Sequence, residues 1–159
     1  MFPAHIRMGD DGCEIQTAVQ HSRNTADIAA ARLSCAGLAS TGKLLGLVHD
    51  CGKFKEEFAK YMADPKGIRG SVNHTFAGCR LLLDRYHDED PIRRLAAELL
   101  AVTIGSHHGL FDLIDENRES GFLRRMNHSG IGYEESERNS GNVSHHRSLM
   151  NCSISPSRS

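Results

Sequence analysis

The chain has 159 residues, of which 39% are hydrophobic and 25% charged, and its formal net charge is −1. These values suit one globular domain with a hydrophobic core, and the near-neutral charge argues against a broad basic surface for nucleic acid. No apolar run of about 18 residues predicts a membrane span, and residues 1–20 lack an apolar signal-peptide core, so we expect a cytoplasmic protein.

Helical periodicity predicts six helices in chain order. The first spans about residues 25–38 and is capped by Asn24. The second begins at Ser40 or Thr41 and closes at Gly52. The other four are predicted over residues 55–62, 74–86, 91–106 and 119–126, with Asp90-Pro91 starting the third of these because proline suits a first helical turn.

No segment shows a strand alternation longer than a few residues, so the predicted class is all-α. From Ser129 onward serine, asparagine and glycine dominate and apolar residues are sparse. Such a composition buries little apolar surface, which predicts a disordered or poorly packed tail. The chain is therefore divided into a domain over residues 1–128 and a polar tail over residues 129–159.

Histidines recur at the boundaries of the predicted helices. They are His21, His49 followed directly by Asp50, His74, and the pair His107-His108. A carboxylate can bridge two cations about 3.5–4 Å apart, and neutral imidazoles complete the ligand sets without adding negative charge. This pattern predicts a site for up to two divalent ions. Imidazole with carboxylate favours manganese, iron, cobalt, nickel or zinc, with magnesium a less suitable candidate.

The remaining histidines are given no functional role. His5, His87 and His128 are interpreted as solvent-facing side chains. His145-His146 lies in the polar tail, where no structured site is expected.

The residues around His49 resemble a known motif. The run Val48-His49-Asp50-Cys51-Gly52-Lys53-Phe54 is similar to the core motif of the HD superfamily. The wider pattern resembles the CRISPR-associated HD nucleases, the nuclease part of the type I interference helicase-nuclease. The resemblance covers roughly residues 4–136, and the other matching stretches are Gln16-Thr17 with His21, Asn73 to Gly78, and Ser106 to Gly109.

The resemblance implies an HD-domain helical bundle and a role for each matching residue. His21, His49 and Asp50 would hold one metal, and Asp50 would bridge to a second metal held by His74, His107 and His108. Asp50 and Lys53 would be the catalytic residues, with Lys53 facing the scissile phosphate. The implied substrate is single-stranded DNA, and the implied partners are a helicase subunit or domain and a CRISPR guide complex.

One family ligand has no counterpart in this chain. The family completes its first metal site with an aspartate on a later helix, but no aspartate follows His128, and Asp112 and Asp115 are poorly placed substitutes. Three hypotheses therefore stay open: a nuclease of CRISPR antiviral defence, an HD phosphohydrolase acting on a nucleotide or small phosphate ester, and a truncated, inactive HD domain that only binds a partner. The ordered motifs favour the first.

Overall fold

The computed structural model describes residues 1–10, 12–64, 66, 71–109, 120–127 and 131–141. The fold is mostly helical, as predicted, and none of the described helices is long and apolar enough to cross a membrane. An antiparallel hairpin of β1 (Pro3–Gly9) and β2 (Gly12–Thr17) comes first. The helices are α1 (Ala18–Leu33), α2 (Ala39–Val48), α3 (Glu56–Ala63), α4 (Phe76–Tyr86), α5 (Pro91–Gly105), α6 (Gly121–Met126) and α7 (Glu134–Gly141), with 3₁₀ turns η1 (Ser34–Ala36) and η2 (Cys51–Phe54).

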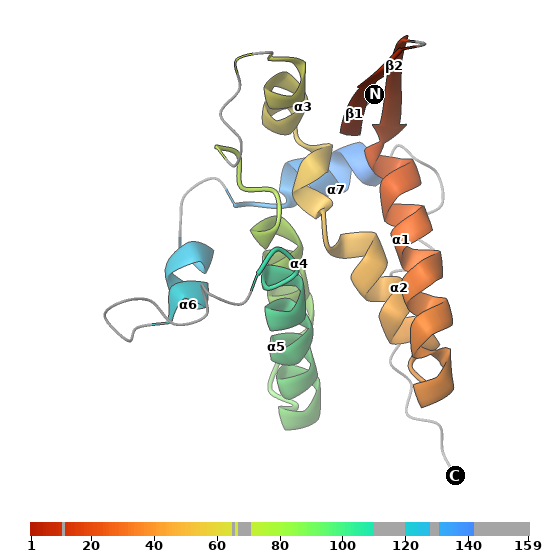
Figure 1. Ribbon diagram of the computed structural model, residues 1–159. Coiled ribbons are helices and arrows are strands. Elements are labelled where there is room, and N and C mark those ends of the chain that lie inside the picture. The colour runs from red at the N-terminus through yellow and green to blue at the C-terminus, as the bar shows by residue number, and fades with distance from the viewer. Residues whose placement is uncertain (11, 65, 67–70, 110–119, 128–130, 142–159) are drawn as a thin grey trace.

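Two helical pairs form the body of the domain. Helix α1 lies against α2, and α4 lies against α5 (Figure 1). Gly46 of α2 lets the first pair approach closely, because a methyl group there would overlap the backbone of Ala26. The main core lies between the pairs and consists of Ala26, Leu47, Val48, Cys51, Phe76, Ala77, Cys79, Leu81, Leu82, Ala101, Ile104, Met126 and Ile131.

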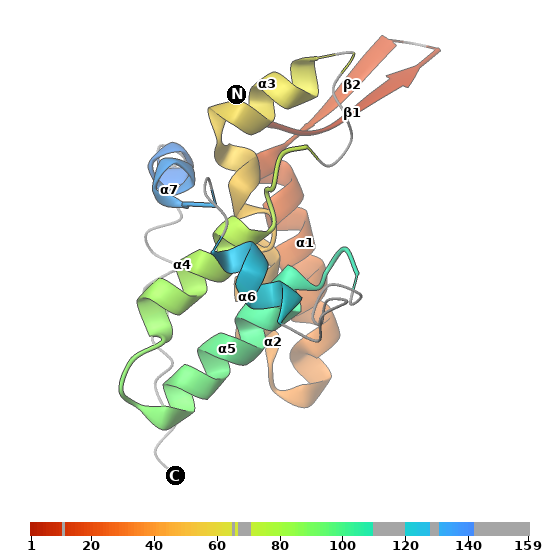
Figure 2. The ribbon, with the colours of Figure 1, turned by 90° about the vertical axis from the view of Figure 1, so that its left-hand side faces the viewer.

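The hairpin was not predicted, and the expectation of no strands is wrong for residues 3–9 and 12–17. Its two strands project beyond the helical pairs, next to α3 (Figure 2). A two-stranded hairpin is marginal by itself, so contacts from elsewhere must hold it. Here Ala4 and Ala18 pack on Phe54 of η2 in a second small core. That contact joins residues far apart in the chain and cannot be read from local periodicity.

Helix α1 begins seven residues earlier than Thr25, where the first helix was predicted to start. The cap is Thr17 rather than Asn24: the Thr17 hydroxyl oxygen accepts from the Gln20 backbone N–H, and Gln20 Oε1 accepts from the Thr17 N–H. This reciprocal pair is a capping box, whose sequence signature Thr-x-x-Gln is present at residues 17–20. The earlier start places His21 in the first turns of the helix.

Helix α7 lies inside the stretch predicted as a disordered tail, so that prediction is wrong for residues 134–141. The helix packs on η2 and is hydrogen-bonded to the start of α3. Asn139 Nδ2 donates to the Phe54 carbonyl oxygen at 2.8 Å, and Glu135 Oε1 accepts from the Glu56 N–H at 2.8 Å. These two hydrogen bonds join residues 134–141 to the rest of the described fold. Residues 142–159 of the predicted tail lie outside the described residues.

Candidate metal centre

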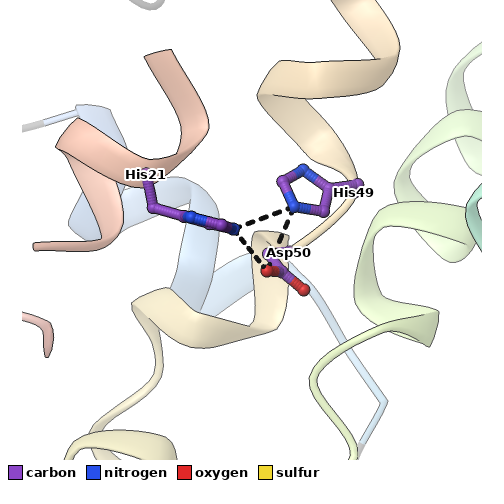
Figure 3. Close-up of side chains that lie close together, drawn as sticks. All are labelled: His21, His49 and Asp50. Atoms are coloured by element: carbon purple, nitrogen blue, oxygen red, sulfur yellow. Dashed lines mark hydrogen bonds and ion pairs between the residues drawn. The ribbon is translucent and has the colours of Figure 1, made fainter. Parts of the chain in front are cut away.

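The histidines predicted as ligands come together at one place, although they leave four separate helix ends. His21 comes from the start of α1, and His49 with Asp50 ends α2 (Figure 3). His74 directly precedes α4, and His107-His108 follows α5. Gly52 allows the turn after Asp50 to approach the segment that carries His74. Its N–H donates to the His74 carbonyl oxygen at 3.0 Å, and a methyl group at Gly52 would overlap the His74 backbone.

Asp50 is the centre of this cluster and is only 3% exposed. Its Oδ2 atom lies 3.0 Å from His21 Nε2, 3.1 Å from His49 Nε2 and 2.9 Å from Lys53 Nζ. Its Oδ1 atom lies 3.4 Å from His107 Nε2 and 3.6 Å from His74 Nε2. The two oxygens of one carboxylate therefore face two different sets of nitrogen atoms.

The ligand atoms form two groups that could each hold a metal ion. One is His21, His49 and Asp50, and the other is Asp50, His74 and His108; within each group the ligand atoms lie within 4.8 Å of one another. The Nε2 atoms are 3.1 Å apart in the pair His21 and His49, and 3.3 Å apart in His74 and His108. Bonds of about 2.0–2.1 Å from one metal to two imidazoles leave the nitrogens roughly 3 Å apart, so these spacings fit shared coordination.

Backbone carbonyls fix the orientation of three imidazoles. The Nδ1–H groups of His49, His74 and His107 donate to the carbonyl oxygens of Gly46, Val72 and Ile104, at 2.9, 3.2 and 2.7 Å. A carbonyl can only accept, so Nδ1 carries the proton in each ring, and in the neutral form Nε2 presents its lone pair. This is how histidine ligands are commonly oriented by their surroundings. All three lone pairs point toward Asp50.

A cation fits this arrangement and would remove its main electrostatic defect. Asp50 Oδ1 is buried and has no hydrogen-bond partner among the described residues. An unpaired buried acceptor costs about 1–3 kcal/mol, and more when it is charged. Imidazole lone pairs directed at the same anionic oxygen add repulsion. A divalent ion between them satisfies the carboxylate and the imidazoles together, so the residues present suit a metal.

The pKa values reflect the same surroundings. Burial acts to raise the pKa of Asp50, but hydrogen bonds from the imidazoles of His107, His21 and His49, which form when their Nε2 atoms carry protons, outweigh it and hold that pKa far below its usual range. Burial lowers the pKa of His74 and of His108, the latter also through the neighbouring His107. These shifts keep the carboxylate ionised and favour neutral imidazoles at positions 74 and 108, which are the protonation states that metal binding needs.

Lys53 lies inside the cluster rather than at its edge. Its side chain is buried, and its Nζ atom, 2.9 Å from Asp50 Oδ2, is also 3.4 Å from His5 Nε2. His5 is exposed, as predicted, but its contacts with Lys53 and with the His21 ring were missed. They link β1 to η2 and α1 across the fold, and no spacing rule along the chain indicates such a link.

The described residues supply no second carboxylate to either group, because Asp50 is the acid in both. Asp112 and Asp115 lie outside the described residues. Of the acids late in the chain, Glu135 accepts from the Glu56 N–H and Glu137 pairs with Arg85. His107 contacts Asp50 without completing a three-ligand group, and the roles of all six predicted ligands and of Lys53 stay predictions.

Comparison with protein families identifies one match. The model of the family described as Cas3, HD domain, matches residues 13–145. This span includes β2 from Cys13 onward, the seven helices of the described residues and every predicted ligand. Comparison with curated proteins gives no match.

Proposed function

The chain belongs to the Cas3 HD-domain family, and from this premise we propose that it is a metal-dependent nuclease that hydrolyses phosphodiester bonds of single-stranded DNA in CRISPR interference. The observation that carries the proposal is the buried Asp50 carboxylate, with imidazole nitrogens facing each of its oxygens. A helicase subunit or domain and a guide complex, which would expose the single strand, are the proposed partners.

We propose a role for each residue from its position. Asp50 would bridge two cations, with His21 and His49 on the side of Oδ2, and His74, His107 and His108 on the side of Oδ1. Bound there, divalent transition-metal ions would polarise the phosphate and lower the pKa of a water to about 7. The imidazoles would hold the ions without neutralising them, and nitrogen ligands favour manganese, iron, cobalt, nickel or zinc.

Lys53 is proposed as the residue that contacts the scissile phosphate. Its ammonium group is buried and held against Asp50 Oδ2 at 2.9 Å. An ammonium beside the bridging carboxylate can donate to a phosphate oxygen as negative charge develops on it. Asp50 and Lys53 are therefore the two catalytic residues of the proposal.

The test combines metal analysis of the purified protein with digestion of a labelled single-stranded oligonucleotide. We expect bound transition metal, and cleavage that requires added manganese and stops with a chelator. Cleavage of intact duplex at the same salt concentration should be slower, since the chain carries no excess of positive charge for duplex phosphates.

The same experiment separates the two other hypotheses. Rapid hydrolysis of a nucleotide or small phosphate ester without DNA cleavage would identify a phosphohydrolase. Bound metal without hydrolysis of either substrate would identify an inactive domain that acts only as a binding partner.

A further inference from the structure

A groove lined by polar side chains together with Ile15 runs along the hairpin and the start of α1. Its volume is about 530 Å³, within the range of about 300–1,000 Å³ usual for ligand sites. Its polar lining residues are His5 and Arg7 of β1, Glu14 and Gln16 of β2, and Gln20 and Asn24 of α1. The strand register explains part of this set, since His5 pairs with Gln16 and Arg7 with Glu14 across the hairpin.

The lining offers hydrogen bonds rather than a net charge. Arg7 and Glu14 cancel, and the amides of Gln16 and Asn24 each present both donors and acceptors. The Gln20 carbonyl oxygen is already used by the helix cap, which leaves its N–H groups to donate to a ligand. Amide side chains match the edges of unpaired bases, which also combine donors and acceptors.

The groove meets the metal centre at His5. The His5 ring packs edge-on against His21, with centroids 4.7 Å apart at 72°, and its Nε2 atom lies 3.4 Å from Lys53 Nζ. A lysine ammonium can only donate, so His5 Nε2 accepts from Lys53. One end of the groove therefore touches both a proposed metal ligand and the proposed phosphate contact.

We propose that this groove binds the nucleotides next to the scissile phosphate of a single-stranded DNA substrate. A strand whose phosphate lies beside Lys53 can continue past His5 onto Arg7, Gln16 and Asn24, where Arg7 meets a backbone phosphate and the amides meet base edges. The bases of a duplex are paired and cannot offer these edges. The assignment rests on the proposed nuclease function, whose substrate strand it positions.

The test measures strand binding apart from cleavage. Fluorescence anisotropy of a labelled ~12-nucleotide single strand gives Kd in the presence of a chelator, so no hydrolysis occurs. The double variant Arg7→Ala/Asn24→Ala should raise Kd about tenfold, the effect of losing one phosphate contact and one hydrogen-bonding amide. The matched control is Arg94→Ala/Asn127→Ala, which removes the same residue types from exposed positions on α5 and after α6 and should change Kd less than about twofold.

Three other outcomes would overturn the proposed groove. Equal Kd values for the groove variant and the control, or no measurable binding by the unaltered chain, would overturn the groove. Competition by a single mononucleotide as strong as by the whole strand would also overturn it, because the site would then hold one nucleotide only. Failure of the nuclease function is seen separately, as an uncut oligonucleotide after incubation with manganese.

Discussion

The two sides of Asp50 differ in what already balances its charge. On the Oδ2 side, Lys53 supplies a buried ammonium at 2.9 Å, with His21 and His49 close by. On the Oδ1 side, His107 and His74 stand at 3.4 and 3.6 Å, and the oxygen has no hydrogen-bond partner among the described residues. A cation should therefore bind more tightly on the Oδ1 side. A cation on the Oδ2 side would be repelled by the positive charge of Lys53.

Removing the residue that both sides share should have the largest effect. Asp50→Ala deletes the carboxylate of both ligand groups, so we expect single-stranded DNA hydrolysis with manganese to fall at least about 100-fold and bound metal to be lost. Cleavage rates and metal analysis check this. The control is Asp27→Ala, which removes an exposed carboxylate from α1. Near wild-type rates in Asp50→Ala would contradict the proposed two-metal site.

The comparison of the two sides predicts about one tightly bound metal per chain, on the Oδ1 side, with a second appearing only at high metal concentration. His107→Ala should weaken the tight site about 10- to 100-fold. His21→Ala should change its affinity little, because His21 contacts Oδ2. Titration of the metal-free protein with manganese measures both. Two equally tight ions in the unaltered chain would contradict the comparison and would indicate another ligand in place of the family's late aspartate.

Lys53→Met tests whether the ammonium opposes the second ion. Methionine keeps much of the apolar length but removes the charge beside Oδ2, so the weaker ion should bind about tenfold more tightly. DNA cleavage at saturating manganese should fall, because Lys53 is the proposed phosphate contact. Lys60→Met, on an exposed position of α3, is the matched control. An unchanged affinity for the second ion would show that Lys53 does not distinguish the two sides.

The ligand cluster was predictable from sequence because its signals are local. His49, Asp50 and His107 each stand where a strong helical period stops, and the order of the motifs gave the family. The division of the histidines into two sets was implied only by the resemblance, and the oxygen of Asp50 that each one faces was not predicted, because side-chain direction at a helix end depends on packing. The backbone carbonyls that orient His49 and His107 illustrate this, since nothing in residue type marks Gly46 or Ile104 as acceptors.

Helix α7 and the hairpin, which pack next to the cluster, were not predicted from sequence for a different reason. Helix α7 packs through Ser136 and Ser140, which are buried although serine is a polar residue. Small side chains allow close approach to η2 without the leucine periodicity that marks a helix in sequence, so residues 134–141 looked like a polar tail. The hairpin depends likewise on Phe54, far along the chain. Polar packing and long-range contacts thus limited the prediction more than the chemistry of the site did.

The smallest predicted effect concerns α7. This helix packs on η2, the turn that carries Lys53, and therefore supports the Oδ2 side of Asp50. Asn139→Ala removes the 2.8 Å hydrogen bond to the Phe54 carbonyl oxygen, where η2 ends. One such bond contributes about 1 kcal/mol, which lowers the melting temperature of a domain of this size by about 2–4 °C. Because the histidines that face Oδ1 lie at the ends of α4 and α5, the affinity of the tight metal should stay the same. Arg138→Ala, at an exposed position of the same helix, should leave the melting temperature unchanged. Loss of the tight metal in Asn139→Ala would show that the two sides of Asp50 are not supported independently.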